Sequence, residues 1–242
     1  MSPELAIDWR ARSVAAPDLE QDVLDLYAQA LSPRHIAQFL AVPLALVQQI
    51  LRSHGLESVP PLPTVGDLPP VHQCLVSRRC ADYLLAGQNR EQVPVSSLGL
   101  VTITRLKGYN HFWVCTYLID YLCLGLKDTL GPRPLERDRY DAFIANCYQA
   151  FAEGYCEISL AQAQALVFGA VEYGAKAGFE PAAGFTETVY HLGDGSGQPQ
   201  LEFGYQGQPF YINGPYDNAR QVIKSLETHV GRGKFRYILG IG

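Results

Sequence analysis

Two carboxylates and a lysine are the residues whose types could support acid–base chemistry. Asp120 lies inside an apolar segment, residues 116–128 (TYLIDYLCLGLKD), and Lys127 follows at its end. Burying a carboxylate is costly unless it is paired. Asp120 therefore either faces solvent or a basic partner, or has a shifted pKa and serves as an acid, a base or a metal ligand. Together with Asp217, these residues define a candidate catalytic pocket.

His191 is the fourth catalytic candidate. His191 and Asp194 could form an acid–base pair in a glycine-rich loop beside a sheet edge, or the stretch is a polar loop in which Asp194 favours a turn. His72 and Cys74, with Cys80, have a loose metal-ligand spacing, but a structural zinc site needs four ligands, usually in closer pairs. We therefore expect no metal and no cofactor. The sequence lacks the motifs of serine hydrolases, zinc proteases, P-loop proteins and dinucleotide-binding proteins. Whether the protein is an enzyme therefore stays open at this point.

A basic segment closes the chain. From residue 210 onward there are five basic and two acidic residues, a net charge of +3. Arg232, Lys234 and Arg236 alternate with Phe235 and Tyr237, which favours binding of phosphate or single-stranded nucleic acid. The alternative is a solvated face beside a glycine turn. Upstream, a strand is expected to end near residue 213 and Asp217 to cap the next helix. The turn there either binds an anion or is a plain turn, because an Asp217 cap already fills part of the site.

Residues 31–51 (LSPRHIAQFLAVPLALVQQIL) have the apolar spacing of two short packed helices. Ile36, Ala37 and Leu40 form the inner face of the first, and Val47 and Ile50 that of the second. A further helix is expected over residues 19–30, and Ser32 could cap the helix that begins at Pro33. This pattern resembles the helix-turn-helix superfamily. The resemblance implies that the second helix meets base edges in duplex DNA. The residues that would contact nucleic acid in this unit are Arg34, Leu44, Gln48, Gln49 and Arg52.

The charge of this region does not favour DNA. Residues 1–60 hold four basic and seven acidic residues, a net charge of −3, whereas phosphate contacts supply most of the affinity of such units. A helix-turn-helix that binds a protein partner through Leu44, Ala45 and Leu46 is the alternative, and packing within the chain itself is a third.

The composition is that of an ordinary folded protein, with 48% apolar and 18% charged residues among 242. The net charge of −5 excludes a chain coated with positive charge for indiscriminate nucleic-acid binding. We expect a cytoplasmic protein without a signal peptide or a membrane segment, since the longest apolar stretch is interrupted by Asp120. None of the six cysteines forms a C-x-x-C pair, which favours buried, reduced thiols.

Prolines divide the chain. We predict a helix-turn-helix unit over residues 1–56, a proline-rich linker over 57–71 and an α+β domain over 72–242. The α+β domain should begin with a hairpin, residues 97–107 and 111–126, whose second strand is long or continues into a buried strand. A helix over 135–152 and another from Ser159, with a capping box to Gln162, follow. A second hairpin around Gly207, a helix over 218–228 and a closing strand complete a mostly antiparallel sheet with covering helices.

Two motifs of the predicted domain resemble those of a bacterial family of unknown function. They are LID–CLG–KD at residues 118–128, where the family has LVD, and GQPFYINGPYD at residues 207–217. With the stretch 169–181 (GAVEYGAKAGFEP), the resemblance extends over most of residues 98–242. It implies a shared fold and assigns no catalytic residue.

Taken together, these patterns predict a nucleic-acid-associated regulatory protein, acting in transcription, that uses its helix-turn-helix. Its partner would be duplex DNA or another nucleic acid. Two alternatives remain: an interaction or scaffold protein, and an enzyme with a pocket around Asp120, Lys127 and Asp217.

Overall fold

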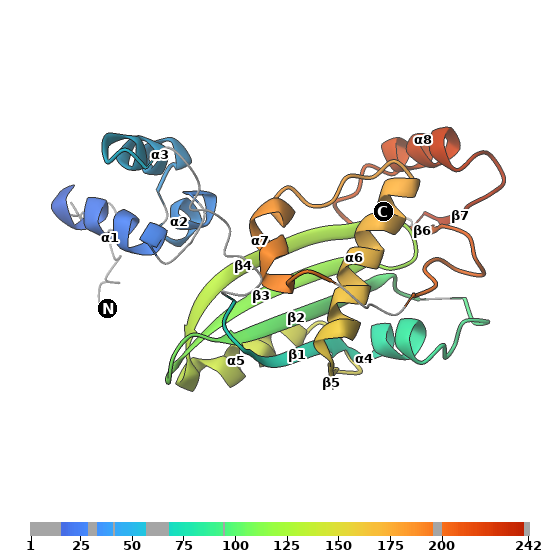
Figure 1. The fold of residues 1–242 in the computed structure, drawn as a ribbon. Coiled ribbons are helices and arrows are strands. Elements are labelled where there is room, and N and C mark those ends of the chain that lie inside the picture. Colours follow the sequence, from blue (N-terminus) through green and yellow to red (C-terminus); the bar gives the residue numbers. More distant parts are fainter. Residues whose placement is uncertain are drawn as a thin grey trace, which may run out of the picture. The chain divides into compact units, whose positions relative to one another are not determined.

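The computed structural model of the chain describes residues 16–28, 33–40, 42–56, 68–93, 95–195 and 200–239 (Figure 1). The chain divides into two compact units, Met1–Leu62 and Pro63–Gly242, and each has its own hydrophobic core. The predicted proline-rich linker, residues 57–71, lies outside the described residues except at its last four positions.

The first unit consists of three helices in its described residues: α1 (Ala16–Ala28), α2 (Pro33–Phe39) and α3 (Leu44–Ser53). Its core contains six buried side chains, two from each helix: Val23 and Tyr27, Ile36 and Ala37, Val47 and Leu51. Leu40 and Ile50 are partly buried against that core, as their spacing predicts. Ser32, the predicted cap of α2, lies outside the described residues.

A five-stranded antiparallel sheet forms the centre of the second unit. Its strands are β1 (Val71–Ser77), β2 (Leu98–Leu106), β3 (His111–Asp120), β4 (Gly125–Glu136) and β5 (Tyr155–Ile158). The order across the sheet is β4-β3-β2-β1-β5, and each pair of neighbours is antiparallel. The predicted α+β class with a mostly antiparallel sheet is confirmed.

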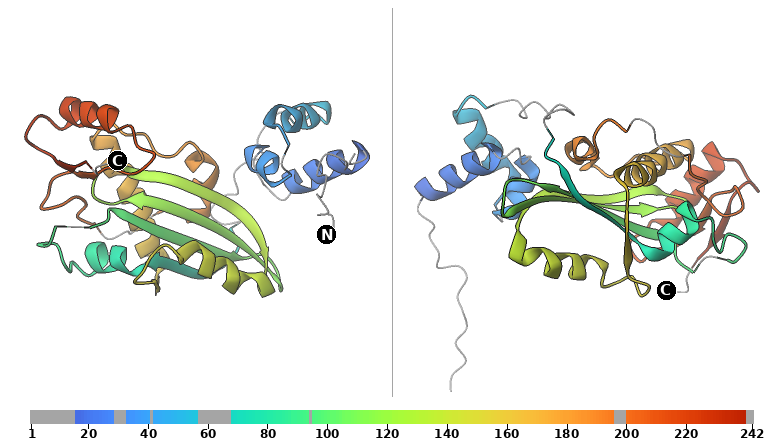
Figure 2. Two further views of the ribbon diagram at one scale, coloured as in Figure 1. Left: turned by 180° about the vertical axis from the view of Figure 1, so that it is seen from behind. Right: turned by 60° about the horizontal axis from the view of Figure 1, so that its bottom comes forward.

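Helices cover both faces of this sheet (Figure 2). Because side chains alternate along a strand, Phe112 and Val114 pack against α5 (Arg137–Tyr148), whereas Cys115 and Tyr117 pack on the face covered by α6 (Leu160–Lys176). Helix α7 (Phe185–Leu192) lies on the same face as α6, and a short α4 (Arg78–Cys80) continues into a π-helix (Ala81–Leu85) after β1. All six cysteines are free thiols, and four of them are buried.

The start of α6 confirms the predicted capping box. The Ser159 hydroxyl accepts the Gln162 N–H at 3.2 Å, and the Gln162 side chain accepts the Ser159 N–H at 2.9 Å. Two N–H groups at the helix start are thereby satisfied by side chains.

The sequence suggests that the apolar segment 111–126 forms a single strand, but the structure divides it. β3 ends at Asp120, residues 121–124 form a turn, and β4 begins at Gly125. The turn buries three apolar side chains, those of Tyr121, Leu122 and Cys123. In sequence the turn therefore cannot be distinguished from a buried strand. Gly125 has a φ of +76°, a backbone conformation that favours glycine.

The predicted second hairpin around Gly207 is wrong. Residues near Gly207 form only an isolated bridge, between Tyr205 and Gln208. β6 (Phe210–Ile212) pairs in parallel with β7 (Arg236–Ile238), and α8 (Ala219–His229) connects the two strands. A turn signal identifies the bend at Gly207 but does not identify the strand that β6 pairs with.

Candidate functional site

Asp120 serves the turn between β3 and β4. Its side chain is 1% exposed, and its Oδ1 atom accepts the N–H groups of Leu122 at 3.1 Å and Cys123 at 2.9 Å. The Ser97 hydroxyl donates to Oδ2 at 3.1 Å. Burial raises the pKa of Asp120 to about 6, against the lowering effect of these donors and of the Lys127 charge. This contact pattern is that of a side chain that replaces backbone hydrogen bonds in a turn.

Lys127 and Asp217 form a partly buried ion pair. The Lys127 Nζ atom lies 2.8 Å from Asp217 Oδ1, while Asp217 Oδ2 accepts the Gly214 N–H at 3.0 Å and the Tyr211 hydroxyl at 3.3 Å. Burial alone would raise the pKa of Asp217, but these three donors hold it below its usual value. The structure therefore brings two of the three predicted pocket residues together, as a link from β4 to the turn before α8.

The sequence predicts that Asp217 caps α8, but it does not. Asn218 does so, because its side-chain Oδ1 accepts the Gln221 N–H at 3.2 Å. The Asp217 carboxylate instead folds back onto Gly214, three residues earlier. The two residues are adjacent and both are common caps, so sequence alone does not separate them.

His191 lies in the last turn of α7, not in the predicted glycine-rich loop. It is fully buried, whereas Asp194 is exposed. Its Nε2 atom lies 3.1 Å from the Ile103 carbonyl oxygen, and its Nδ1 atom has no hydrogen-bond partner in the described structure. Burial, together with the Arg105 charge, lowers the pKa of His191 to about 3. A neutral, enclosed imidazole of this kind packs α7 onto the sheet.

Arg105 is a buried cation that sequence reasoning missed. Its Nε–H donates to the His191 carbonyl at 2.9 Å, and its Nη1 atom donates to the Pro69 carbonyl at 2.8 Å. Gln164 donates to the Leu192 carbonyl at 2.8 Å. Two side chains thus satisfy the last carbonyl groups of α7. The available signal was an arginine within the β-branched run VTITR.

The predicted contact face of the first unit lies on α3. Val47 and Leu51 are buried, whereas Gln48, Gln49 and Arg52 are exposed. The Arg52 Nε–H donates to the Gln48 carbonyl at 3.2 Å, which keeps the start of its side chain on the helix surface. The side chains of three further predicted residues lie outside the described structure: Arg34, Leu44 and Ala45.

The three predicted cations near the C-terminus have different surroundings. Arg232 pairs with Glu227 at 3.2 Å, and the Arg236 guanidinium lies 5.6 Å from the centre of the Tyr205 ring. Lys234 is exposed and makes no ion pair within the described residues. The stretch is therefore not a uniform row of free cations.

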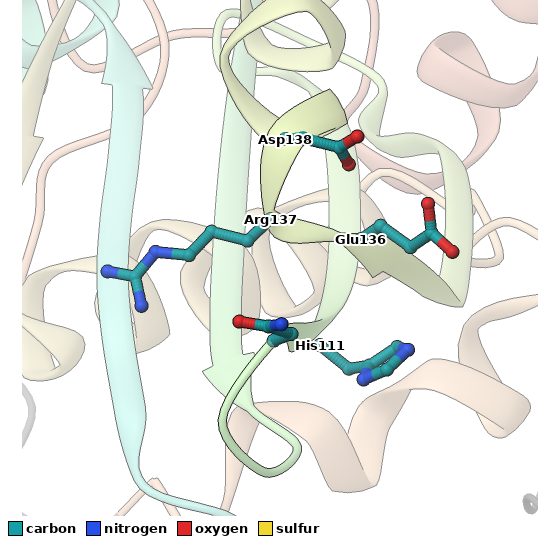
Figure 3. A pocket seen from close by; sticks show the side chains of 5 residues that line it. His111, Glu136, Arg137 and Asp138 are labelled. Carbon is teal, nitrogen blue, oxygen red and sulfur yellow. The ribbon is translucent and has the colours of Figure 1, made fainter.

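A depression of about 570 Å³ lies where the β2–β3 turn meets the start of α5 (Figure 3). Its lining residues are all exposed: Asn110, His111, Glu136, Arg137 and Asp138. His111 and Glu136 are neighbours across β3 and β4, and Arg137 extends away from both. These side chains do not converge on one point, so the depression lacks the geometry of a catalytic site.

A second depression, of about 250 Å³, lies between α4, the π-helix and the turn after β3. Tyr83 and Tyr121 contribute to its wall, but both rings are almost fully buried. Their hydroxyl groups donate inward, to the Gly204 and Ser96 carbonyl oxygens. The depression offers to solvent both charged and amide groups and the exposed apolar side chains of Val93 and Val95.

Comparison with known proteins adds no assignment to this geometry. The chain matches no family model, no curated protein and no solved structure. Within the described ranges, no helix has the length and apolar character that a membrane crossing requires, and no group of three or more His, Cys, Asp or Glu side chains could hold a metal ion.

Proposed function

We propose that the N-terminal unit binds duplex DNA through the exposed face of α3. The observation that carries this proposal is the division of α3 into a buried side, with Val47 and Leu51, and an exposed side, with Gln48, Gln49 and Arg52. The preceding α2 has seven residues, and only residues 40–43 separate the two helices. Short helices joined in this way are typical of helix-turn-helix units.

The exposed side chains suit base edges better than phosphates. A glutamine can pair with adenine through two hydrogen bonds, and an arginine can pair with guanine. The exposed face of α1 is acidic, with Asp22 and Asp25, and Glu20 contacts His54 just beyond α3. We therefore expect weak binding that depends on base sequence and falls only modestly with added salt, because few phosphate contacts form.

A selection from a pool of random DNA duplexes, with the full chain at about 50 mM salt, tests this proposal. We expect one sequence class to be enriched. Replacing Gln48 and Gln49 by alanine should weaken its binding about tenfold or more, since a good pair of base contacts is worth about 1–3 kcal/mol. Gln21→Ala is the matched control, because Gln21 is an exposed glutamine on α1. Failure to enrich any sequence, or equal binding by both variants, refutes the proposal.

Docking of a protein partner is the second candidate. Leu46 on α3 is 36% exposed and Phe39 on α2 is 57% exposed, which leaves apolar area on the first unit in contact with water. This candidate predicts a partner that co-purifies with the full chain and is lost in Leu46→Asp. If Leu46→Asp retains every partner, this function does not use α3.

A further inference from the structure

The outer side of β7 is an unpaired strand edge within the described residues. The Arg236 N–H donates to the Pro209 carbonyl at 2.9 Å, and the Ile238 carbonyl accepts the Asn213 N–H at 3.1 Å. Alternate residues of a strand turn their peptide groups to opposite sides, so Tyr237 presents its N–H and carbonyl away from β6. These groups are ready to pair with another strand.

The side chains along this edge are more apolar than water-facing strands usually are. Tyr237 is 50% exposed, Ile238 46% and Leu239 48%. Three consecutive half-exposed apolar residues beside free peptide groups are a surface that a protein normally covers.

The positive charge beside β7 indicates what kind of strand would pair with it. Lys234 and Arg236 are exposed at and just before this strand, in a segment of net charge +3 within a chain of net charge −5. Pairing of two β7 strands from two copies of the chain would bring these cations together. An extended segment with acidic side chains would instead neutralise them, while its alternate apolar residues cover Tyr237 or Ile238.

We propose that β7 is a docking edge for an extended acidic peptide from a partner protein, which adds a third strand to the β6–β7 pair. Main-chain hydrogen bonds to Tyr237 supply affinity, and Lys234 and Arg236 select carboxylates. This docking edge belongs to the second unit and does not depend on DNA binding by α3.

Selection of random peptides of about ten residues against the full chain tests the proposal, since such a peptide exceeds the length of a typical strand. We expect enriched peptides to alternate acidic and apolar residues. The synthesised consensus peptide should bind about tenfold more weakly to Lys234→Glu, whereas Lys224→Glu, the same charge change at an exposed position of α8, should bind as wild type does. Enrichment of no peptide, or of peptides without acidic excess, overturns the proposal.

Main-chain pairing needs its own readout. Tyr237→Pro removes the outward N–H, while Tyr237→Thr keeps it and removes the ring, so only the proline variant should lose most of the binding. In the wild type, the consensus peptide should slow amide hydrogen exchange at Tyr237 and Leu239, which needs no variant to fold. Unchanged exchange at both residues overturns the strand-addition geometry. Tight binding of oligothymidine with no bound peptide assigns the surface to single-stranded nucleic acid and also overturns the proposal.

Discussion

Replacing Asp120 by asparagine separates the structural role of this side chain from a role that needs its charge. The asparagine oxygen can accept the same Leu122 and Cys123 N–H groups, and the Ser97 hydroxyl can rotate to accept from the new amide. The substitution therefore keeps the hydrogen bonds of the turn and removes one buried negative charge.

The expected magnitude follows from the pKa. Burial raises the pKa of Asp120 from 3.8 to about 6, and one pKa unit corresponds to about 1.4 kcal/mol. The folded chain thus binds this proton more tightly than the unfolded chain does. Its contribution to stability is greatest below pH 4 and falls by about 3 kcal/mol as the pH rises from 4 to 6. Asp120→Asn should therefore be more stable than wild type above pH 6, by up to that amount, and similar to it at pH 4.

Urea unfolding at several pH values, followed by circular dichroism, measures this difference. Subtracting the two proteins at each pH removes the contribution of other titrating groups. Asp120→Ala is the control for the turn, because it leaves two buried N–H groups without an acceptor and should destabilise at every pH. A stability difference between Asp120→Asn and wild type that stays the same from pH 4 to pH 7.5, or that turns against the variant as the pH rises, would refute this account.

Three further changes test other parts of the second unit. Wild type should lose stability as the pH falls from 6.5 toward 3, because the lowered pKa of His191 favours its neutral form in the folded state, and His191→Gln should remove this loss. Unfolding at pH 5 and pH 7 measures the difference. Identical pH profiles of the two proteins would contradict the burial of a neutral imidazole. Gly125→Ala should lower stability by about 3 kcal/mol or more, because the new methyl group would lie 2.5 Å from the Ala170 carbonyl oxygen at a position of positive φ. The control is Gly108→Ala, which also has a positive φ but open space around it. It should cost only about 1–2 kcal/mol in the same unfolding assay. Ser159→Ala should lower stability by about 1 kcal/mol through loss of the α6 cap, and no change would show that Gln162 alone suffices.

Sequence patterns predicted the elements whose signals are local. The capping box at Ser159 and the spacing of apolar residues placed α6 and α5 correctly within a few residues. β1 was missed because prolines immediately before it resemble a linker, and α7 because its short pattern lies between two glycine-rich stretches. The pairing of β6 with β7 joins residues 26 positions apart, such as Phe210 and Arg236, and no local pattern contains such a relation.

The candidate site was predictable only in part. The alternative hypothesis of an enzyme pocket grouped Lys127 with Asp217, and the structure shows an ion pair between them. The three hydrogen bonds that commit Asp120 to a turn depend on where β3 ends, and the apolar residues after it conceal that point. His191 was assigned to a loop because the glycines that follow it are more conspicuous than the helix that precedes it.

The position of β1 between β2 and β5 has a consequence during synthesis of the chain. β5 pairs with β1 through residues 155–158 and 74–77. About eighty further residues must therefore be synthesised after β1 before its second neighbour is available. Until then β1 is an edge strand of the meander, as β4 remains in the finished sheet, and chaperone binding to nascent chains should concentrate on that stage.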